Sequence, residues 1–223
     1  MNNVTTTGRK ALVVGCGIAG PVLAMLLRRA GITPVVYEGR PEPSDEAGAF
    51  LNLLEHGLDV LDTLGIREEI EGYGTPTTGM VFANHRGKLL GEMPQAATLL
   101  KRSLLNKGLR EAAIREGVAV EFGKRLEDVE ATPRRGVIAR FEDGSEADDD
   151  FLVGCDGINS QTRRSIMPDA PEPAYTGVIG CGGFTHVPGI PPSDGIMHMT
   201  FGKRGFFGYQ VTPSGEIFWF QKA

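Results

Sequence analysis

The stretch from Ala11 to Gly31 constrains the fold of this chain more than any other. Its sequence, ALVVGCGIAGPVLAMLLRRAG, is compatible with a secretion signal, a buried core segment or a nucleotide cradle. Arg9 and Lys10 precede the uncharged run, as basic residues do in a secretion signal. Three glycines and a proline interrupt that run, no small-residue cleavage site follows, and two arginines close it early. These features disfavour secretion.

The pattern of this stretch favours the nucleotide cradle. Lys10 to Val14 predicts a buried parallel strand, and Ile18 to Arg29 predicts a helix. Between them, Gly15 permits a tight turn, Gly17 allows a pyrophosphate to approach the backbone, and Gly20 lets helix and strand pack closely. The first turn of the helix then offers N–H groups and a positive dipole end to phosphates.

A second strand, Thr33 to Tyr37, ends in Glu38. This is where a dinucleotide fold places the carboxylate that accepts ribose hydroxyls, and its charge would repel a 2′-phosphate. One βαβ length of sequence thus contains a strand, the glycine motif, a helix, a second strand and the acid that ends it. An ordinary glycine turn between core elements is the alternative that remains.

The composition excludes several classes of partner. The 223 residues are 41% hydrophobic with a net charge of -5, and the charges are interspersed, which argues against nucleic acid or an anionic membrane as a partner. The three cysteines and four histidines lack disulfide or metal-ligand spacing. We therefore expect no metal and a reducing, cytoplasmic setting.

Further elements follow along the chain. Leu51 to Leu64 predicts a helix that stops at Gly65, and Asn84 to Gly87 predicts the turn of a hairpin. Ser103 to Glu116 predicts a helix with Ser103 as N-cap. Strands are expected over Val118–Phe122, Arg125–Ala131, Val137–Phe141 and Glu146–Val153.

A second glycine-flanked acid follows an apolar strand at Phe151 to Gly157, with a helix expected over Asn159 to Ile166. Ligands bind at such strand ends in open α/β sheets. Beyond it the composition turns to proline and glycine and then to strands, expected over Val178–His186, Ile196–Phe201, Gly205–Val211 and Glu216–Gln221. These strands predict a second, sheet-based domain.

Four motifs in order, GCGIAG with Glu38, GAFLNLLEHGLDVLDTLG, LKRSLLNKGL and FLVGCDGINSQTRRSI, resemble the class A, single-component FAD-dependent monooxygenases, of the p-hydroxybenzoate hydroxylase and tetracycline-modifying type. The resemblance covers nearly the whole chain. It implies an α/β fold: a Rossmann-like FAD-binding domain with a parallel sheet and a β-meander, and a second β-sheet substrate domain. The FAD-binding domain would comprise residues 1–74 and 98–172, and the substrate-domain strands residues 75–97 and 173–223.

The resemblance also implies roles for residues. The glycine turn would hold the FAD pyrophosphate, Glu38 the adenosine ribose, and Arg102 the phosphate or ribose region. Asp156 and Gly157 would serve FAD and the approach of NAD(P)H, and Gly48 and Ala49 would lie near the flavin ring. The candidate cofactor-binding residues are Gly15, Gly17, Ile18, Ala19, Gly20, Glu38, Gly39, Arg40, Gly48, Ala49, Arg102, Asp156 and Gly157.

The sequence departs from the family pattern in three places. Gly39 separates the acid from Arg40, His56-Gly57 stands where Asn-Gly is common, and no Gly-Asp dipeptide of the family's third fingerprint occurs. The chain stops at Trp219-Phe220-Gln221-Lys222-Ala223, within an expected apolar strand. We therefore expect a fold that is incomplete at the C-terminus, as in a truncated or split enzyme.

The function implied is hydroxylation of a small aromatic or polycyclic organic substrate with FAD, NAD(P)H and O2. Because the cofactor carries the chemistry, no catalytic acid or base is assigned. The aromatic residues of the second domain could wall the substrate, although core packing is the simpler role for each of them. They are Phe201, Phe206, Phe207, Tyr209, Phe218 and Trp219. A reductase or halogenase of the same fold, or a non-catalytic half that needs a complementary C-terminal chain, are the alternatives.

Overall fold

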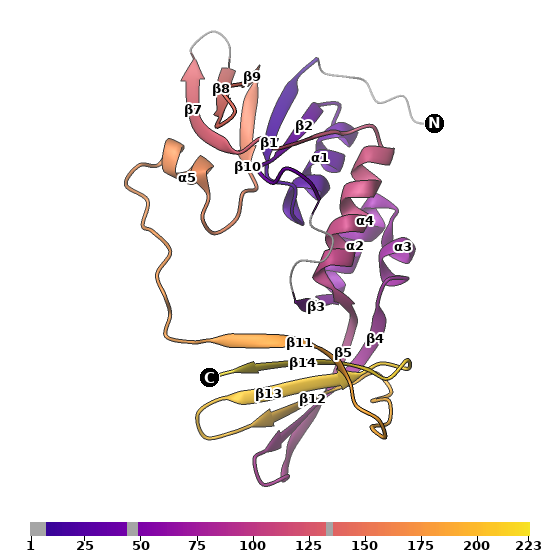
Figure 1. Ribbon diagram of the computed structural model, residues 1–223. Helices are drawn as coiled ribbons and strands as arrows, with labels where there is room; N and C mark the ends of the chain where they lie inside the picture. Colours follow the sequence, from indigo (N-terminus) through magenta and orange to yellow (C-terminus); the bar gives the residue numbers. More distant parts are fainter. Residues whose placement is uncertain (1–7, 44–48, 133–135) are drawn as a thin grey trace. The chain divides into compact units, whose positions relative to one another are not determined.

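The computed structural model describes residues 8–43, 49–132 and 136–223. The chain divides into two compact units, one of residues 1–46 and 105–174 and the other of residues 47–104 and 175–223. Each unit is built around its own sheet or sheets (Figure 1).

A four-stranded parallel sheet forms the centre of the first unit, with strand order β10-β1-β2-β6. The strands are β1 (Lys10–Val14), β2 (Thr33–Glu38), β6 (Ala119–Phe122) and β10 (Phe151–Gly154). Helix α1 (Ala19–Arg29) connects β1 to β2. The strands are apolar because parallel strands are covered on both faces; Ala11 and Val13 are fully buried. The predicted βαβ unit is therefore confirmed.

A three-stranded antiparallel meander packs against this sheet. It consists of β7 (Leu126–Thr132), β8 (Gly136–Phe141) and β9 (Glu146–Asp149). Phe141 of the meander is 1% exposed and lies against Tyr37 of β2, with 4.9 Å between the ring centroids. Leu12 and Val14 of β1 belong to the same buried cluster. The predicted combination of parallel sheet and meander is confirmed.

The second unit holds a seven-stranded sheet of order β11-β14-β13-β12-β4-β5-β3. Its strands are β3 (Phe50–Leu54), β4 (Thr75–Asn84), β5 (Leu89–Lys101), β11 (Gly180–His186), β12 (Ile196–Phe201), β13 (Phe206–Val211) and β14 (Glu216–Lys222). Phe50 on one edge strand lies 5.3 Å from Phe218 and 6.0 Å from Phe184, which is on the other edge strand. The sheet therefore curls until its two edge strands approach each other across an aromatic core.

The helix predicted over Leu51 to Leu64 is wrong in its first part. Residues Phe50–Leu54 form β3, which pairs with β5, and α2 begins only at Glu55 (Glu55–Leu64). The apolar run before Glu55 fits a strand as well as a helix, and pairing with β5 decides between them. The predicted stop is correct, because Gly65 takes the left-handed conformation with φ of 69°.

Two other boundaries differ from the sequence predictions. The run expected as one strand over Glu146–Val153 is split at Asp150 into β9 and β10, which belong to different sheets. Ser103 is not an N-cap, because α4 (Arg102–Arg115) already begins one residue earlier. The remaining helices are α3 (Arg67–Glu71) and α5 (Gln161–Ile166).

The compact units and the expected domains divide the chain differently. Residues 49–74 and 98–104, which the resemblance assigns to the FAD-binding domain, lie in the second compact unit. They do so because β3 pairs with β5 and β5 with β4, which ties these segments to the seven-stranded sheet. The assignment of some segments to the cofactor and of others to the substrate stays a prediction.

The fold class is confirmed: an α/β chain with a Rossmann-like parallel sheet, a meander and a second sheet. None of the helices in the described ranges is long and apolar enough to cross a membrane. Within residues 8–43, 49–132 and 136–223, no group of three or more histidine, cysteine or acidic side chains is arranged to hold a metal ion.

Candidate functional site

The glycine turn after β1 has the geometry of a phosphate cradle. Gly15 has φ of 104°, and a Cβ there would lie 2.5 Å from the carbonyl oxygen of Cys155. A Cβ at Gly20 would lie 1.9 Å from the carbonyl oxygen of Gly15. Side chains are therefore excluded at both positions. A Cβ at Gly17 would meet nothing within 4 Å, which leaves open space beside the backbone.

Helix α1 begins directly behind this turn. Its N-cap position, Ile18, makes no side-chain capping hydrogen bond, and its first turn holds no acidic residue. The first N–H groups of a helix have no partners within the helix, and the helix dipole places partial positive charge there. The start of α1, which includes Ala19 and Gly20, is therefore suited to an anion such as a diphosphate.

Glu38 stands at the end of β2, next to the glycine turn. Its Oε2 accepts a hydrogen bond from the backbone N–H of Cys16 at 2.8 Å, and its Oε1 accepts one from the backbone N–H of Arg40 at 3.0 Å. Each oxygen retains a lone pair that could accept a ribose hydroxyl. The side chain of Arg40 is exposed, and the backbone of Gly39 lies against Arg125.

Cys16 sits inside the glycine turn and adds no charge to it at neutral pH. Burial, and next the neighbouring Glu38 carboxylate, raise the pKa of the Cys16 thiol from 9.0 to about 11, while Arg110 opposes the shift. The thiol is therefore protonated at pH 7. A diphosphate in the cradle would not meet a thiolate there.

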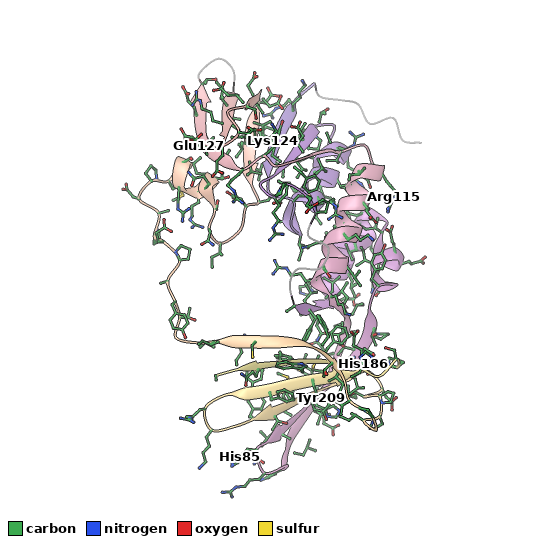
Figure 2. The ribbon with its side chains drawn as sticks, in the orientation of Figure 1. His85, Arg115, Lys124, Glu127, His186 and Tyr209 are labelled. Carbon is green, nitrogen blue, oxygen red and sulfur yellow. The ribbon has the colours of Figure 1, made fainter. Side chains whose placement is uncertain are left out.

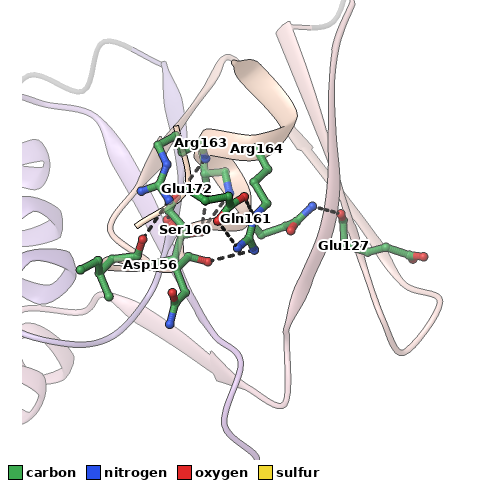
Figure 3. Close-up of polar contacts among 10 residues, drawn as sticks. Glu127, Asp156, Ser160, Gln161, Arg163, Arg164 and Glu172 are labelled. Carbon is green, nitrogen blue, oxygen red and sulfur yellow. Dashed lines mark hydrogen bonds and ion pairs between the residues drawn. The ribbon is translucent and has the colours of Figure 1, made fainter. Parts of the chain in front are cut away.

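Asp156 follows β10, which is the neighbour of β1 in the sheet. Its carboxylate accepts a hydrogen bond from the hydroxyl of Ser160 at 2.6 Å (Figure 3). It also accepts one from the backbone N–H of Thr162 at 2.9 Å. It therefore supports the start of α5, where Ser160 caps the N–H of Arg163. Gly157 has φ of 81° and an exposed backbone.

Further polar contacts fix the loop on both sides of α5. Arg164 forms an ion pair with Glu172, with 2.9 Å between Nε and Oε1, and Gln161 donates to the backbone carbonyl of Glu127 at 2.9 Å (Figure 3). The side chains of Ser160 and Thr162, which hold Asp156, were not anticipated from the sequence. The signal available was a serine at the N-cap position before a short helical run.

The structure brings the candidate residues of the first unit together at one edge. Because β10, β1 and β2 are parallel neighbours, their carboxyl ends share an edge of the sheet. The residues found there are Gly15, Gly17, Ile18, Ala19, Gly20, Glu38, Gly39, Arg40, Asp156 and Gly157. Two other candidates, Ala49 and Arg102, lie in the second unit, where the N–H of Arg102 donates to the carbonyl of Ala49 at 3.0 Å. Gly48 lies outside the described residues.

A cavity of about 380 Å³ opens in the second unit where the two edges of the curled sheet approach each other. Phe50 and Phe220 line it with their rings 5.8 Å apart in an edge-on contact, together with Asn52 and Lys222. Gly182 of β11 and the candidate residue Ala49 also line it. The cavity is thus mainly apolar with an amide and an ammonium group at its margin.

The aromatic residues that were expected to line a substrate site lie on both faces of the sheet. Phe218 is 5% exposed and belongs to the core beside Phe50. Phe207, by contrast, is 42% exposed and stacks on Trp219, with 6.3 Å between the ring centroids. Phe220, which lines the cavity, was not among the residues expected to do so.

The chain is similar to a known family and to several known proteins. Residues 9–207 match the family described as FAD binding domain. The chain is 32% identical over 193 residues to an FAD-dependent urate hydroxylase of Klebsiella oxytoca. The matched region covers 80% of this chain and 48% of that protein. The chain is 27% identical over 228 residues to an aurachin C monooxygenase/isomerase of Stigmatella aurantiaca, covering 97% of this chain and 57% of that protein.

A solved structure of a variant of HpxO from Klebsiella pneumoniae complexed with FAD superposes with a TM-score of 0.84 at 25% identity. The superposition covers 96% of this chain and 57% of that one. The chain spans about half the length of the curated relatives that it matches. The chain belongs to the family described as FAD binding domain, and the relatives that it resembles include FAD-dependent urate hydroxylases.

Proposed function

We propose that this protein is an FAD-dependent monooxygenase that uses NAD(P)H and O2 to hydroxylate a small aromatic or polycyclic organic substrate. The observation that carries the proposal is the cradle of the first unit. An uncapped helix start and open space over Gly17 lie beside a carboxylate, Glu38, that is fixed by two backbone N–H groups. The named functions of the relatives support the same reaction class.

The residues of the first unit would bind the adenosine diphosphate half of FAD. The N–H groups at Gly17, Ile18 and Ala19 would donate to the diphosphate, and the carboxylate of Glu38 would accept the ribose hydroxyls. Gly15 and Gly20 act by leaving room, since a side chain at either position would collide with backbone. The backbone of Gly39 and the side chain of Arg40 would border the ribose.

Other candidates would serve the rest of the cofactor. Asp156 would hold its loop in place while the backbone of Gly157 contacts FAD and admits NAD(P)H. Arg102 would contact the phosphate or ribose region, and Ala49 and Gly48 would border the flavin ring. Bound FAD supplies the redox and oxygen chemistry, so the chain needs to position the substrate and exclude water.

The cavity of the second unit supports a small, mainly apolar substrate. Its volume of about 380 Å³ lies in the range of small-molecule sites, and the Phe50 and Phe220 rings favour a planar group. The proposal includes a reducing, cytoplasmic setting. That setting is supported by three cysteines that form no disulfide.

The cofactor half of the proposal is tested by the visible spectrum of the purified 223-residue chain and by titration with FAD. Stoichiometric FAD supports it, and failure to bind FAD contradicts it. Oxygen uptake with NADPH or NADH, dependent on an added aromatic substrate and giving a hydroxylated product, supports the reaction. FAD-dependent oxidation of NAD(P)H without an oxygenated product favours a reductase instead. Turnover that appears only after adding a C-terminal polypeptide of a relative favours a split enzyme.

A further inference from the structure

Two hairpin turns that are far apart in the sequence meet at one end of the seven-stranded sheet. The turn between β4 and β5 contains His85, which Figure 2 labels at the tip of the hairpin. The turn between β12 and β13 comprises residues 202–205. The two are adjacent because β12 pairs with β4, and the N–H of His85 donates to the carbonyl of Phe201 at 2.9 Å.

Four basic side chains gather on these two turns. Arg86 and Lys88 come from the first turn, Lys203 and Arg204 from the second, and all four residues are exposed. Within the described part of the chain, none of these four side chains forms an ion pair or a hydrogen bond, although the backbone N–H groups of Arg86 and Lys88 donate to the side chain of Asn84. Strands β4, β5, β12 and β13 and the two turns contain one acidic residue, Glu92, which lies opposite Val81 and two residues after Leu90.

Exposed apolar side chains border the same turns. Leu89 and Leu90 are 53% and 56% exposed, and Phe201 is 39% exposed. Leu90 is the unpaired residue of a β-bulge, because Phe82 pairs with Gly91 and Ala83 with Leu89. Exposed apolar side chains therefore directly follow the basic residues of the first turn. We call this set the basic tip: Arg86, Lys88, Leu89, Leu90, Phe201, Lys203 and Arg204.

We propose that the basic tip attaches the protein to an anionic lipid surface. The net charge of the whole chain, -5, does not cancel this attraction, because salt screens charges beyond about 8–10 Å and only the local cluster acts on the surface. Cations beside exposed aliphatic and aromatic side chains are the combination that binds anionic headgroups while apolar groups enter the interface.

A lipid surface fits better than an acidic protein segment. The basic tip is formed by two turns, and none of its residues lines the cavity beside Phe50 or the cavity beside α2. Two neighbouring exposed turns can contact a planar surface at the same time without a groove. The net charge of the chain, which disfavours an anionic membrane as a partner, is an average that hides this cluster, because only the fold brings the two turns together.

The experiment measures binding of the purified 223-residue chain to large unilamellar vesicles by co-sedimentation. Vesicles of phosphatidylcholine alone are compared with vesicles containing phosphatidylglycerol, at low and high salt. We expect binding only to the anionic vesicles, weakened by salt. Each cation neutralised should weaken binding about fivefold, so Arg86→Gln, Lys88→Gln, Lys203→Gln and Arg204→Gln together should weaken it more than a hundredfold.

Matched controls separate the tip from general charge. Lys107 of α4 is exposed and also makes no ion pair among the described residues, so Lys107→Gln should change vesicle binding less than twofold, against about fivefold for Lys88→Gln. Leu89→Ser with Leu90→Ser should reduce the binding that survives at high salt. Circular dichroism melting verifies that each variant is folded.

Three results with vesicles alone would overturn the proposal. They are no binding to anionic vesicles, equal binding to both kinds of vesicle, and unchanged binding of the fourfold variant. Binding to a soluble acidic polymer but not to vesicles would also overturn it, in favour of an acidic macromolecule as partner. The FAD titration is independent of these measurements, so the lipid proposal and the proposed function fail separately.

Discussion

Glu38 and Cys16 are joined by a hydrogen bond of 2.8 Å in which the backbone N–H of Cys16 donates to the Glu38 carboxylate. This bond ties the end of β2 to the glycine turn after β1. The second carboxylate oxygen accepts the N–H of Arg40 at 3.0 Å. Both oxygens are thus oriented without a ligand, so little ordering of the side chain would oppose the proposed binding of a ribose.

Removing the charge of Glu38 should weaken FAD binding while the fold survives. Glu38→Gln keeps one oxygen acceptor but loses the carboxylate, and hydrogen bonds to charged groups contribute about 1.5–3 kcal/mol. We expect the Kd for FAD to rise roughly tenfold to a hundredfold, measured by fluorescence titration. Glu121→Gln, at an exposed position on β6, is the control and should leave the Kd unchanged. Equal affinities for Glu38→Gln and the parent chain would show that this carboxylate does not contact the cofactor.

Gly17 and Gly20 should respond differently to the same methyl group. A Cβ at Gly20 would lie 1.9 Å from the carbonyl oxygen of Gly15, so Gly20→Ala must displace backbone and should destabilise the protein by several kcal/mol, about 3 or more. A Cβ at Gly17 meets nothing, so Gly17→Ala should leave the melting temperature within about 2 °C. FAD binding should nevertheless weaken in Gly17→Ala, because the methyl group would occupy the space proposed for the diphosphate. Urea unfolding and FAD titration test the pair, and equal stabilities would contradict the steric assignment.

Asp156 should be needed for stability even without a cofactor. Asp156→Ala removes the acceptor for the Ser160 hydroxyl and for the Thr162 N–H, and both of those residues are buried. Losing such a cap costs about 1–2 kcal/mol. Urea unfolding of FAD-free protein measures this loss, with Asp169→Ala at an exposed position as the control. If the FAD-free variant were as stable as the parent chain, the hydrogen bonds of the Asp156 carboxylate would not stabilise the fold.

The sequence predicted the βαβ unit well because its signals are local. The apolar run Lys10–Val14, the glycine turn and Glu38 each constrain a few consecutive residues, and the observed strand boundaries coincide with the expected ones. The start of β3 could not be predicted in this way. The segment Phe50–Leu54 is a strand because β5, more than 40 residues later, pairs with it.

The site was predicted unevenly for the same reason. The glycines follow a motif of fixed spacing, so their collisions and open space were foreseeable. The hydrogen bond from Cys16 to Glu38 and the support of Asp156 by Thr162 depend on side chains meeting across the fold. Periodicity and motif spacing carry no information on such contacts.

Gln210 should stabilise the second unit through a buried polar network. It is 0% exposed, its Oε1 lies 2.8 Å from the hydroxyl of Thr77, and its Nε2 donates to the carbonyl of Pro76 at 3.0 Å. Gln210→Met keeps the volume but leaves the Thr77 hydroxyl without this partner, which should cost about 1–3 kcal/mol. Urea unfolding checks the value, and Gln221→Met at an exposed position should cost less than about 0.5 kcal/mol. Equal losses in the free energy of unfolding for the two variants would show that the hydrogen bonds of Gln210 do not stabilise the protein.

The buried thiol of Cys16 should make the stability of the protein fall in alkaline solution. In the folded chain the pKa of this thiol is raised from 9.0 to about 11, by burial first and then by Glu38. Between these pH values the unfolded chain has lost a proton that the folded chain keeps, so the contribution is complete below pH 9 and disappears as the pH rises toward 11.

The size of this loss and its control follow from the same pKa values. The free energy of unfolding falls by about 1.4 kcal/mol for each pH unit above the pKa of the unfolded thiol, so by pH 10.5 it has fallen by up to about 2 kcal/mol. Tyr37, whose pKa burial raises from 10.0 to about 12, adds a similar loss at higher pH. Cys16→Ala removes the first contribution but leaves the second. Urea unfolding at pH 8 and pH 10.5 should therefore show a smaller decrease for Cys16→Ala than for the parent chain, and identical decreases would mean that the thiol is accessible to water.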